Sequence, residues 1–183
     1  MAADDAVTYR AALPSDAEAI ASLHADSWRR HYRGAYSDAF LDGDVTAERL
    51  LVWTDRMNEP GEGRATIVAE SDGRMVGFCH AVFDQDPRWG TLVDNLHVTY
   101  RLKGGGIGTR LLAHTAEVVV GRRPRTGLYL WVLEQNTAAQ VFYEARGGVR
   151  VEHGWAGTPE GDPRLNGAPG RFRYAWSDPV VLI

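Results

Sequence analysis

Cysteine is nearly absent from this chain of 183 residues, which has only Cys79. No disulfide can therefore form within the chain, and we expect Cys79 to be a small buried residue in a reducing compartment, the cytoplasm. No run of 18 apolar residues occurs, so no membrane-spanning helix and no membrane partner are predicted. The acidic start, MAADDAV, lacks the apolar segment of a signal peptide.

An excess of basic charge and metal-ligand patterns are also missing. Lysine and arginine total 20 against 24 acidic residues, and this net charge of −4 does not favour a nucleic-acid partner. The six histidines and one cysteine match no zinc spacing, so no metal is expected. A Walker A loop is absent, and a dinucleotide fingerprint starting at Gly104 would need glycine where Thr109 stands.

The order of local patterns indicates the fold class. Ser15 and Glu18 have the spacing of a capping box at a helix start, and Asp72-Gly73 between two strand-like runs predicts a hairpin. Hairpins mixed with strand–helix–strand units favour an α/β (α+β) fold with a mixed sheet. We expect one domain over 1–183 with its core at about 7–177. Strands are predicted at 7–12, 65–70, 74–84, 91–98, 127–134, 149–155 and 171–177, and helices from Ser15, at 46–57, at 107–120 and from Asn136 to about Gly147.

A glycine-rich turn at 103–109, KGGGIGT, separates a predicted strand from a predicted helix. Glycines let the backbone approach a ligand closely, and a helix N-terminus offers unpaired N–H groups with partial positive charge. The turn therefore predicts an anion site, most simply a pyrophosphate, with Lys103 and Thr109 adding a charge and a hydroxyl. The simpler alternative is a merely flexible turn, but the strand before it and the amphipathic helix after it favour the anion site.

Two blocks carry a family resemblance. The turn resembles motif A of the GNAT superfamily of N-acetyltransferases, R/Q-x-x-G-x-G/A, with Lys103 in place of Arg or Gln and Tyr100 in place of the preceding proline. The stretch 128–148 resembles the next family block, a strand followed by N-x-x-A-x-x-F-Y-E-x-x-G. Its matching residues are Asn136, Ala139, Phe142, Tyr143, Glu144 and Gly147.

The resemblance implies a single GNAT domain whose mostly antiparallel sheet has about seven strands, about four flanking helices and a splayed central strand pair. It also implies acetyl-coenzyme A as the co-substrate, without a metal. The expected coenzyme contacts are the turn and the second block, together with backbone groups of the preceding strand. These residues are Leu96, His97, Val98, Lys103, Gly104, Gly105, Gly106, Ile107, Gly108, Thr109, Asn136, Ala139, Phe142 and Tyr143.

Tyr143 is the expected catalytic acid, because the family tyrosine lies near the thioester sulfur. A phenol with an ordinary pKa near 10 can give a proton to a leaving thiolate. The alternative is that Phe142 and Tyr143 are only core aromatics of an amphipathic helix, which we favour for Phe142 but not for Tyr143. Asn136 could be only a helix cap.

Asp94 is the candidate general base and an acceptor-binding residue. Several family members carry a base at this point of the strand, and strand alternation would put Asp94 on the face of Leu92, Leu96 and Val98, with His97 on the face of Val93 and Asn95. The alternative role of Asp94 is to pair with a charged neighbour. His97, His80 and Glu70 are weaker candidates, and an ordered water could serve instead of any of them.

The acceptor side is expected at SWRRHYRGAYSDAFL (27–41), which is similar to a family pattern W-x-x-x-Y-x-G. Trp28, Tyr32 and Tyr36 are its candidate substrate contacts, with core packing as the alternative, favoured for Trp28. The loop 156–170 and the strand 171–176 are expected to form the opposite wall. Because loops vary freely, the amine acceptor stays open between a small molecule and a peptide.

These observations predict an N-acetyltransferase that acts by direct attack of a primary amine on acetyl-coenzyme A. A non-catalytic acyl-coenzyme A sensor or scaffold with the same fold is the first alternative. A nucleotide-binding oxidoreductase with an unusual glycine loop is the second. A homodimer is possible, since family members often dimerise.

Overall fold

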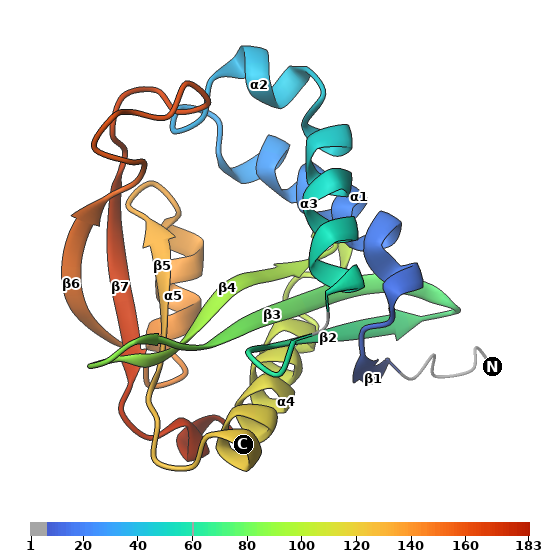
Figure 1. Cartoon of the computed structure of the whole chain (residues 1–183), viewed down its shortest axis with the longest axis vertical. Coiled ribbons are helices and arrows are strands. Elements are labelled where there is room, and N and C mark those ends of the chain that lie inside the picture. The colour runs from blue at the N-terminus through green and yellow to red at the C-terminus, as the bar shows by residue number, and fades with distance from the viewer. Residues whose placement is uncertain (1–6, 60) are drawn as a thin grey trace.

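A mixed sheet of seven strands organises the described part of the chain (Figure 1). The structure, a computed structural model, describes residues 7–59 and 61–183, so most of the acidic N-terminal segment lies outside it. The strand order is β1-β2-β3-β4-β5-β7-β6, and only β4 and β5 are parallel. The strands are Thr8–Ala11 (β1), Arg64–Ser71 (β2), Arg74–Asp86 (β3), Gly90–Val98 (β4), Leu128–Leu133 (β5), Val149–Trp155 (β6) and Gly170–Trp176 (β7).

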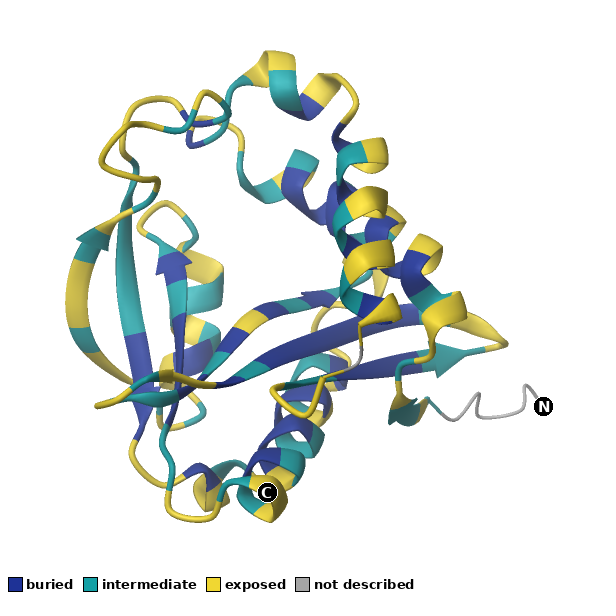
Figure 2. Cartoon of the chain, in the orientation of Figure 1, coloured by how far each residue is buried: buried dark blue, intermediate teal, exposed yellow. Residues whose placement is uncertain are grey.

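Helices cover both faces of this sheet, and buried residues follow the sheet and the inner helix faces (Figure 2). The helices α1 and α3 pack on one face through a cluster that includes Trp53 and Phe78. The helices α4 and α5 share the other face, where a larger cluster includes Leu111 and Tyr174. The α-helices are Ala17–His31 (α1), Asp38–Asp42 (α2), Val45–Asn58 (α3), Ile107–Arg122 (α4) and Thr137–Glu144 (α5).

The predicted element order and the α/β fold class are confirmed, with five α-helices in the described residues instead of about four. The hairpin at Asp72-Gly73 forms with both residues at positive φ. The predicted capping box at Ser15 and Glu18 is wrong. A short 3-10 turn begins at Pro14, and Asp16 accepts a hydrogen bond from the backbone N–H of Leu13 at 2.7 Å, so the capping is done from the preceding turn.

The expected splay of the central strands is also present. The strands β4 and β5 pair only at Thr91 with Leu128 and at Leu92 with Tyr129. Beyond Leu92, β4 has no strand partner on its β5 side in the described chain, although its other edge stays paired with β3. Buried backbone N–H and C=O groups that lack a strand partner need another hydrogen-bond partner. The wedge between the strands therefore offers donors and acceptors to a ligand that carries amides.

A β-bulge at Asp94 changes which faces the β4 side chains occupy. Ala81 of β3 pairs with Val93 and the preceding His80 pairs with Asn95, so Asp94 is the extra residue. A bulge reverses the alternation beyond it. Asn95 and His97 therefore face α1 and α3, whereas Val93 joins the cluster under α4. The predicted grouping of His97 with Val93 is wrong for this reason.

Candidate active site

The glycine turn leads directly into α4. Gly104 and Gly106 have φ of +84° and +82°, the left-handed region that favours glycine, and Gly106 is the N-cap of the helix. A Cβ at Gly108 would lie 3.4 Å from the ring of Phe142, so that position also brings α4 and α5 close together. The turn thus presents backbone N–H groups at a helix N-terminus, as an anion site requires.

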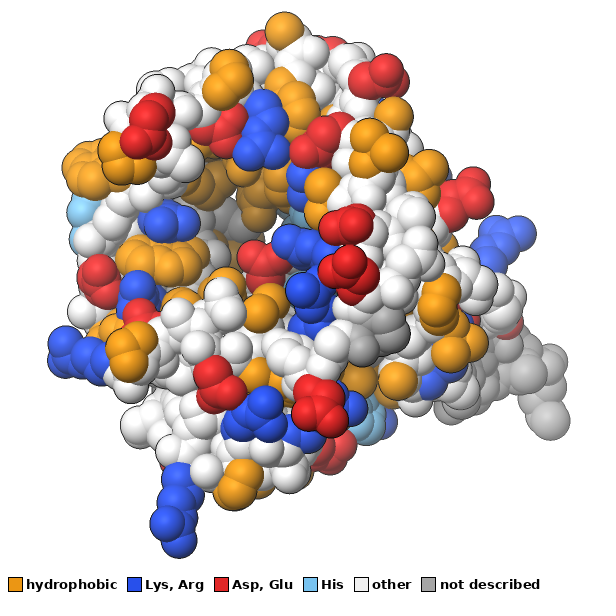
Figure 3. Space-filling view, viewed as in Figure 1, with side chains coloured by type: hydrophobic (Ala, Val, Ile, Leu, Met, Phe, Trp, Pro, Cys, Tyr) orange, Lys and Arg blue, Asp and Glu red, His pale blue; other side chains and the backbone are white. Residues whose placement is uncertain are grey.

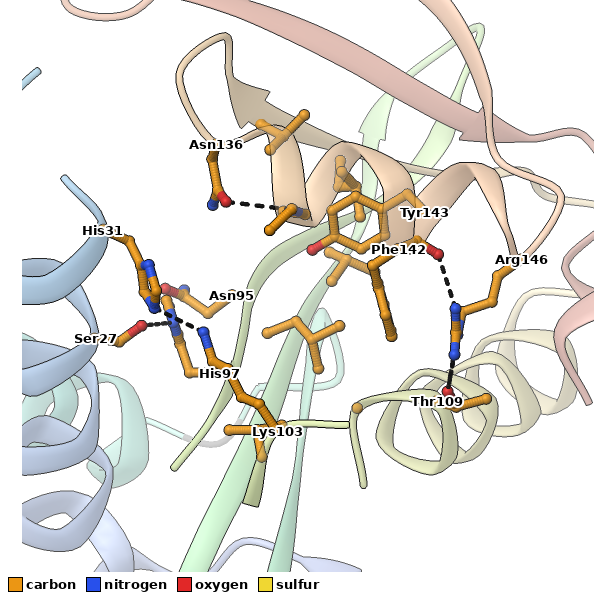
Figure 4. A pocket seen from close by; sticks show the side chains of 18 of the residues that line it. Ser27, His31, Asn95, His97, Lys103, Thr109, Asn136, Phe142, Tyr143 and Arg146 are labelled. Atoms are coloured by element: carbon orange, nitrogen blue, oxygen red, sulfur yellow. Dashed lines mark hydrogen bonds between the residues drawn. The ribbon is translucent and has the colours of Figure 1, made fainter. Parts of the chain in front are cut away.

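A cavity of about 350 Å³ lies between this turn, the splayed part of β4 and α5 (Figure 4). It brings together most of the residues predicted from the sequence. They are Tyr32, Asp94, Leu96, His97, Val98, Lys103, Gly104, Gly106, Gly108, Thr109, Asn136, Ala139, Phe142 and Tyr143.

Four predicted residues do not line this cavity. Gly105 and Ile107 line a separate depression on the other side of the turn, and the Ile107 side chain is buried in the core. Trp28 and Tyr36 pack against each other with ring centroids 4.8 Å apart, and Tyr36 stacks on Tyr32. Of the three predicted acceptor aromatics, Tyr32 is therefore the one that reaches the cavity.

Arg146 is a cavity residue that the sequence analysis missed. Its guanidinium donates to the Thr109 hydroxyl at 2.8 and 2.5 Å and to the backbone carbonyl of Phe142 at 3.0 Å, and it lies 3.9 Å from the centre of the Phe142 ring (Figure 4). The i, i+4 spacing of Phe142 and Arg146 was the available signal. Arg146 adds positive charge beside the helix N-terminus and leaves the Thr109 hydroxyl free to donate its own proton.

Lys103 lies at the other end of the turn, against α1. Its ammonium donates to Nε2 of His31 at 2.7 Å (Figure 4). Burial and then Lys103 lower the pKa of His31, while burial and then Arg30 lower that of Lys103. His31 and the neighbouring cavity residue Ser27 were not predicted from the sequence, because they come from a helix that reaches the site only in the folded chain.

Tyr143 is buried on the inner side of α5, and its hydroxyl projects into the cavity (Figure 4). Its ring packs edge-on against Phe142 and Trp176. Burial, followed by Tyr32, raises the pKa of Tyr143 well above its ordinary value. The phenol is therefore protonated at neutral pH and able to donate.

Asn136 combines the two roles weighed from the sequence. Its side-chain oxygen accepts from the backbone N–H of Ala139 at 3.3 Å, which confirms the predicted cap of α5. The residue also lines the cavity, and its amide nitrogen makes no hydrogen bond within the described part of the chain. Capping the helix orients that nitrogen toward the cavity (Figure 4).

Asp94 lies at the bulge, where it is the only carboxylate among the described residues that line the cavity. It forms an ion pair with Arg56 at 2.9 Å and accepts from the Asn95 side chain at 2.6 Å. His97 is different, because its Nδ1 is hydrogen-bonded to the Ser27 hydroxyl at 2.8 Å and burial lowers its pKa to about 3. The Nδ1 of His97 is therefore already engaged by Ser27, and the imidazole is neutral at neutral pH.

The wall opposite α1 and α3 is formed by β5, β7 and the loop before β7. Figure 3 shows this face of the molecule hollowed between the two walls. The loop does not hang free: the Asn166 side chain donates to the carbonyls of Gly34 and Tyr36 at 3.0 and 3.2 Å, and Leu165 bridges to Tyr36. This docking closes a ring of chain around the hollow (Figure 1).

Neither a metal cluster nor a membrane helix is found in residues 7–59 and 61–183. No three His, Cys, Asp or Glu side chains there are grouped to hold a metal ion. Within the same residues, no helix has the length and apolar character needed to span a bilayer. Cys79 is buried in the core, as expected, and burial raises the pKa of its thiol to about 12.

The fold and cavity define a class of protein with a cavity between two splayed central strands and a helix N-terminus. Residues 22–148 match the model of the acetyltransferase (GNAT) family. The chain belongs to this family and is an acyltransferase.

Known relatives agree with this assignment. Over 140 residues the chain is 26% identical to the probable N-acetyltransferase Rv2775 of Mycobacterium tuberculosis, covering 76% of this chain and 78% of the relative. It is also 26% identical over 148 residues to the uncharacterized N-acetyltransferase YuaI of Bacillus subtilis, with coverage of 79% and 82%.

Solved structures share the fold. The PaiA N-acetyltransferase of Thermoplasma acidophilum in complex with coenzyme A superposes with a TM-score of 0.67 at 19% identity, covering 93% of this chain and 99% of the other. YncA of Salmonella typhimurium with its cofactor acetyl-CoA gives 0.66 at 19% identity, with 93% of each chain covered.

Proposed function

We propose that this chain transfers the acetyl group of acetyl-coenzyme A to a primary amine by direct attack in a ternary complex. The observation that carries the proposal is the placement of the Tyr143 hydroxyl in the same cavity as the glycine turn at the start of α4. An acid beside the sulfur and an anion site for the pyrophosphate are the two features this co-substrate needs.

The coenzyme fits the residues of the cavity. The N–H groups of the turn, with Thr109 and Arg146 beside them, suit the pyrophosphate. The unpaired edge of β4 over Leu96–Val98 suits the amides of the pantetheine arm. The amide nitrogen of Asn136 offers a further donor on the opposite side of the wedge.

In the proposed reaction, the amine nitrogen forms a bond to the thioester carbonyl carbon while the carbon–sulfur bond breaks. Tyr143 gives its proton to the leaving thiolate, and Asp94, directly or through water, takes the proton that the amine loses. Asp94 is preferred over His97 because it is the cavity's only carboxylate among the described residues, whereas His97 is bonded to Ser27 and faces α1.

Substitution of Tyr143 by phenylalanine tests the proposal. Loss of a general acid lowers turnover by roughly 10²- to 10³-fold, while the KM for acetyl-coenzyme A changes little because the turn is intact. The measurement is steady-state release of coenzyme A against a broad panel of amines. Tyr174→Phe is the matched control, since Tyr174 is a buried tyrosine 6.1 Å from Tyr143 by ring centroids but bonds Glu144 outside the cavity.

Unchanged turnover in Tyr143→Phe would remove Tyr143 from the mechanism. Tight binding of coenzyme A without acetylation of any amine would instead favour a non-catalytic sensor or scaffold. The cytoplasmic location and the homodimer expected from the sequence stay predictions.

A further inference from the structure

Arg171, on β7, has no carboxylate partner in the described chain. Its guanidinium lies 4.2 Å from the centre of the Trp131 ring on β5, and its Nε is shielded from solvent without a hydrogen-bond partner. None of its nitrogens donates a hydrogen bond within residues 7–59 and 61–183. Burial and then Arg173 lower the pKa of Arg171, and the more distant charge of Glu152, which pairs with Arg173, offsets this only in part.

Two other arginines around the hollow have carboxylate partners. Arg173 has Asp86 at 2.8 Å and Glu152 at 3.2 Å, and Arg56 has Asp94 at 2.9 Å. Arg171, by contrast, forms no ion pair within residues 7–59 and 61–183, and the charge of Glu152 compensates it only in part. Keeping a half-buried charge unpaired costs free energy, so the site is suited to a ligand that supplies the missing anion.

The position of Arg171 connects it to the reaction site. Trp131 lines the coenzyme cavity with Tyr143 and Asp94, but Arg171 does not. Arg171 pairs in the sheet with Leu133. Leu133 lies two residues beyond Trp131 on β5, a distance of ~7 Å along the strand. An anion on Arg171 would thus belong to the acceptor and not to the coenzyme.

Resting on the proposed function, we infer that the acceptor amine also carries a carboxylate, which Arg171 binds. Stacking on Trp131 fixes the plane of the guanidinium, and its fork of N–H groups matches a carboxylate in that plane. The ring of chain closed by the docked loop at Leu165 and Asn166 favours a small acceptor over a flat protein surface.

Equilibrium binding to the protein saturated with coenzyme A tests this inference without requiring turnover. The probes are amino acids of increasing length, from glycine to 5-aminopentanoate, each compared with its uncharged amide. We expect the best acid to bind at least 10-fold more tightly than its amide. Arg171→Gln should reduce that ratio to about one, because a charge-assisted hydrogen bond typically contributes a 10- to 100-fold effect.

Two further variants keep the test interpretable. Arg171→Met removes the charge but keeps the chain that covers Trp131, so it should also abolish the preference even if Arg171→Gln folds poorly. Arg150→Gln is the matched control, because Arg150 lies 4.6 Å over Phe172 on the opposite face of the same sheet; it should leave the ratio unchanged.

Equal binding of acid and amide by the unmodified protein, or a preference that survives Arg171→Met, would overturn the inference. Tighter binding of an aminoalkyl phosphate than of every amino acid would overturn the choice of carboxylate. Failure of the proposed function looks different: acids would bind through Arg171, but no amine in the panel would be acetylated.

Discussion

Three buried histidines make the stability of this protein sensitive to mild acid. His24, His80 and His97 lie between the sheet and the helices α1 and α3, each with less than a tenth of its surface exposed. Trp53 donates a hydrogen bond to Nδ1 of His24 at 2.9 Å. Nδ1 is therefore the unprotonated nitrogen of the ring, and protonating it to form the charged imidazolium would break this bond. Burial is the main cause that lowers the pKa of all three.

The magnitude follows from the difference between the folded and unfolded pKa. His97 has a pKa of about 3 in the folded protein, so it is neutral at pH 5, whereas in the unfolded chain, with a pKa of about 6.5, it is protonated. The unfolded state then binds more protons, and stability falls as the pH drops below about 6.5. Between pH 6.5 and pH 5 each such histidine costs about 1.6 kcal/mol, roughly 5 kcal/mol for three.

Urea unfolding at a series of pH values measures this effect. Between about pH 6 and pH 5 we expect the free energy of unfolding to fall by about 3–4 kcal/mol per pH unit, which corresponds to two to three protons. Typical domains are stable by about 5–15 kcal/mol, so much of the stability would be lost.

Variants separate the histidines from other titrating groups. His24→Asn should lower the slope of the free energy of unfolding against pH by the equivalent of about one proton. This holds whatever the substitution does to stability at pH 8. His153→Gln, which changes an exposed histidine, should leave the slope nearly unchanged. A slope of one proton or less in the unmodified protein would refute the reasoning.

Two further predictions concern the cavity. Gly108→Val should weaken coenzyme A binding at least 10-fold in a calorimetric titration, because its Cβ already meets the Phe142 ring at 3.4 Å; Gly121→Val, in open space near the end of the same helix, should leave binding intact. Asp94→Asn should lower kcat by roughly 10²-fold and remove the acidic limb of the pH–rate profile; an unshifted profile would exclude Asp94 as the base.

Features set by neighbouring residues were predictable from the sequence. The Asp72-Gly73 hairpin, the Asn136 cap and the glycine turn each depend on a few adjacent residues whose conformational preferences are strong. The element order followed from hydrophobic periodicity, which reports burial directly. The same local patterns, with the family resemblance, located most of the residues around the cavity.

Other features depend on partners far away in the chain. The bulge at Asp94 arises from the pairing of β4 with β3, and no local sequence pattern in β4 predicts it. Ser15 has the right spacing for a cap, but the turn beginning at Pro14 takes over that role. The sequence does not distinguish Arg171 from other strand arginines, whereas in the fold its guanidinium lies over the Trp131 ring and forms no ion pair within the described residues.

By itself, then, the sequence determined the fold class and the glycine turn at the start of α4, because short-range backbone geometry and periodic burial specify them. The tyrosine candidate came from the resemblance of the second block to the family. Only the tertiary structure decided which face Asp94 and His97 occupy, which histidines are buried, and which charges on β7 have no ion pair in the described chain. Those properties depend on contacts between segments tens of residues apart, and the glycine turn becomes part of a site only when such contacts bring α5 beside it.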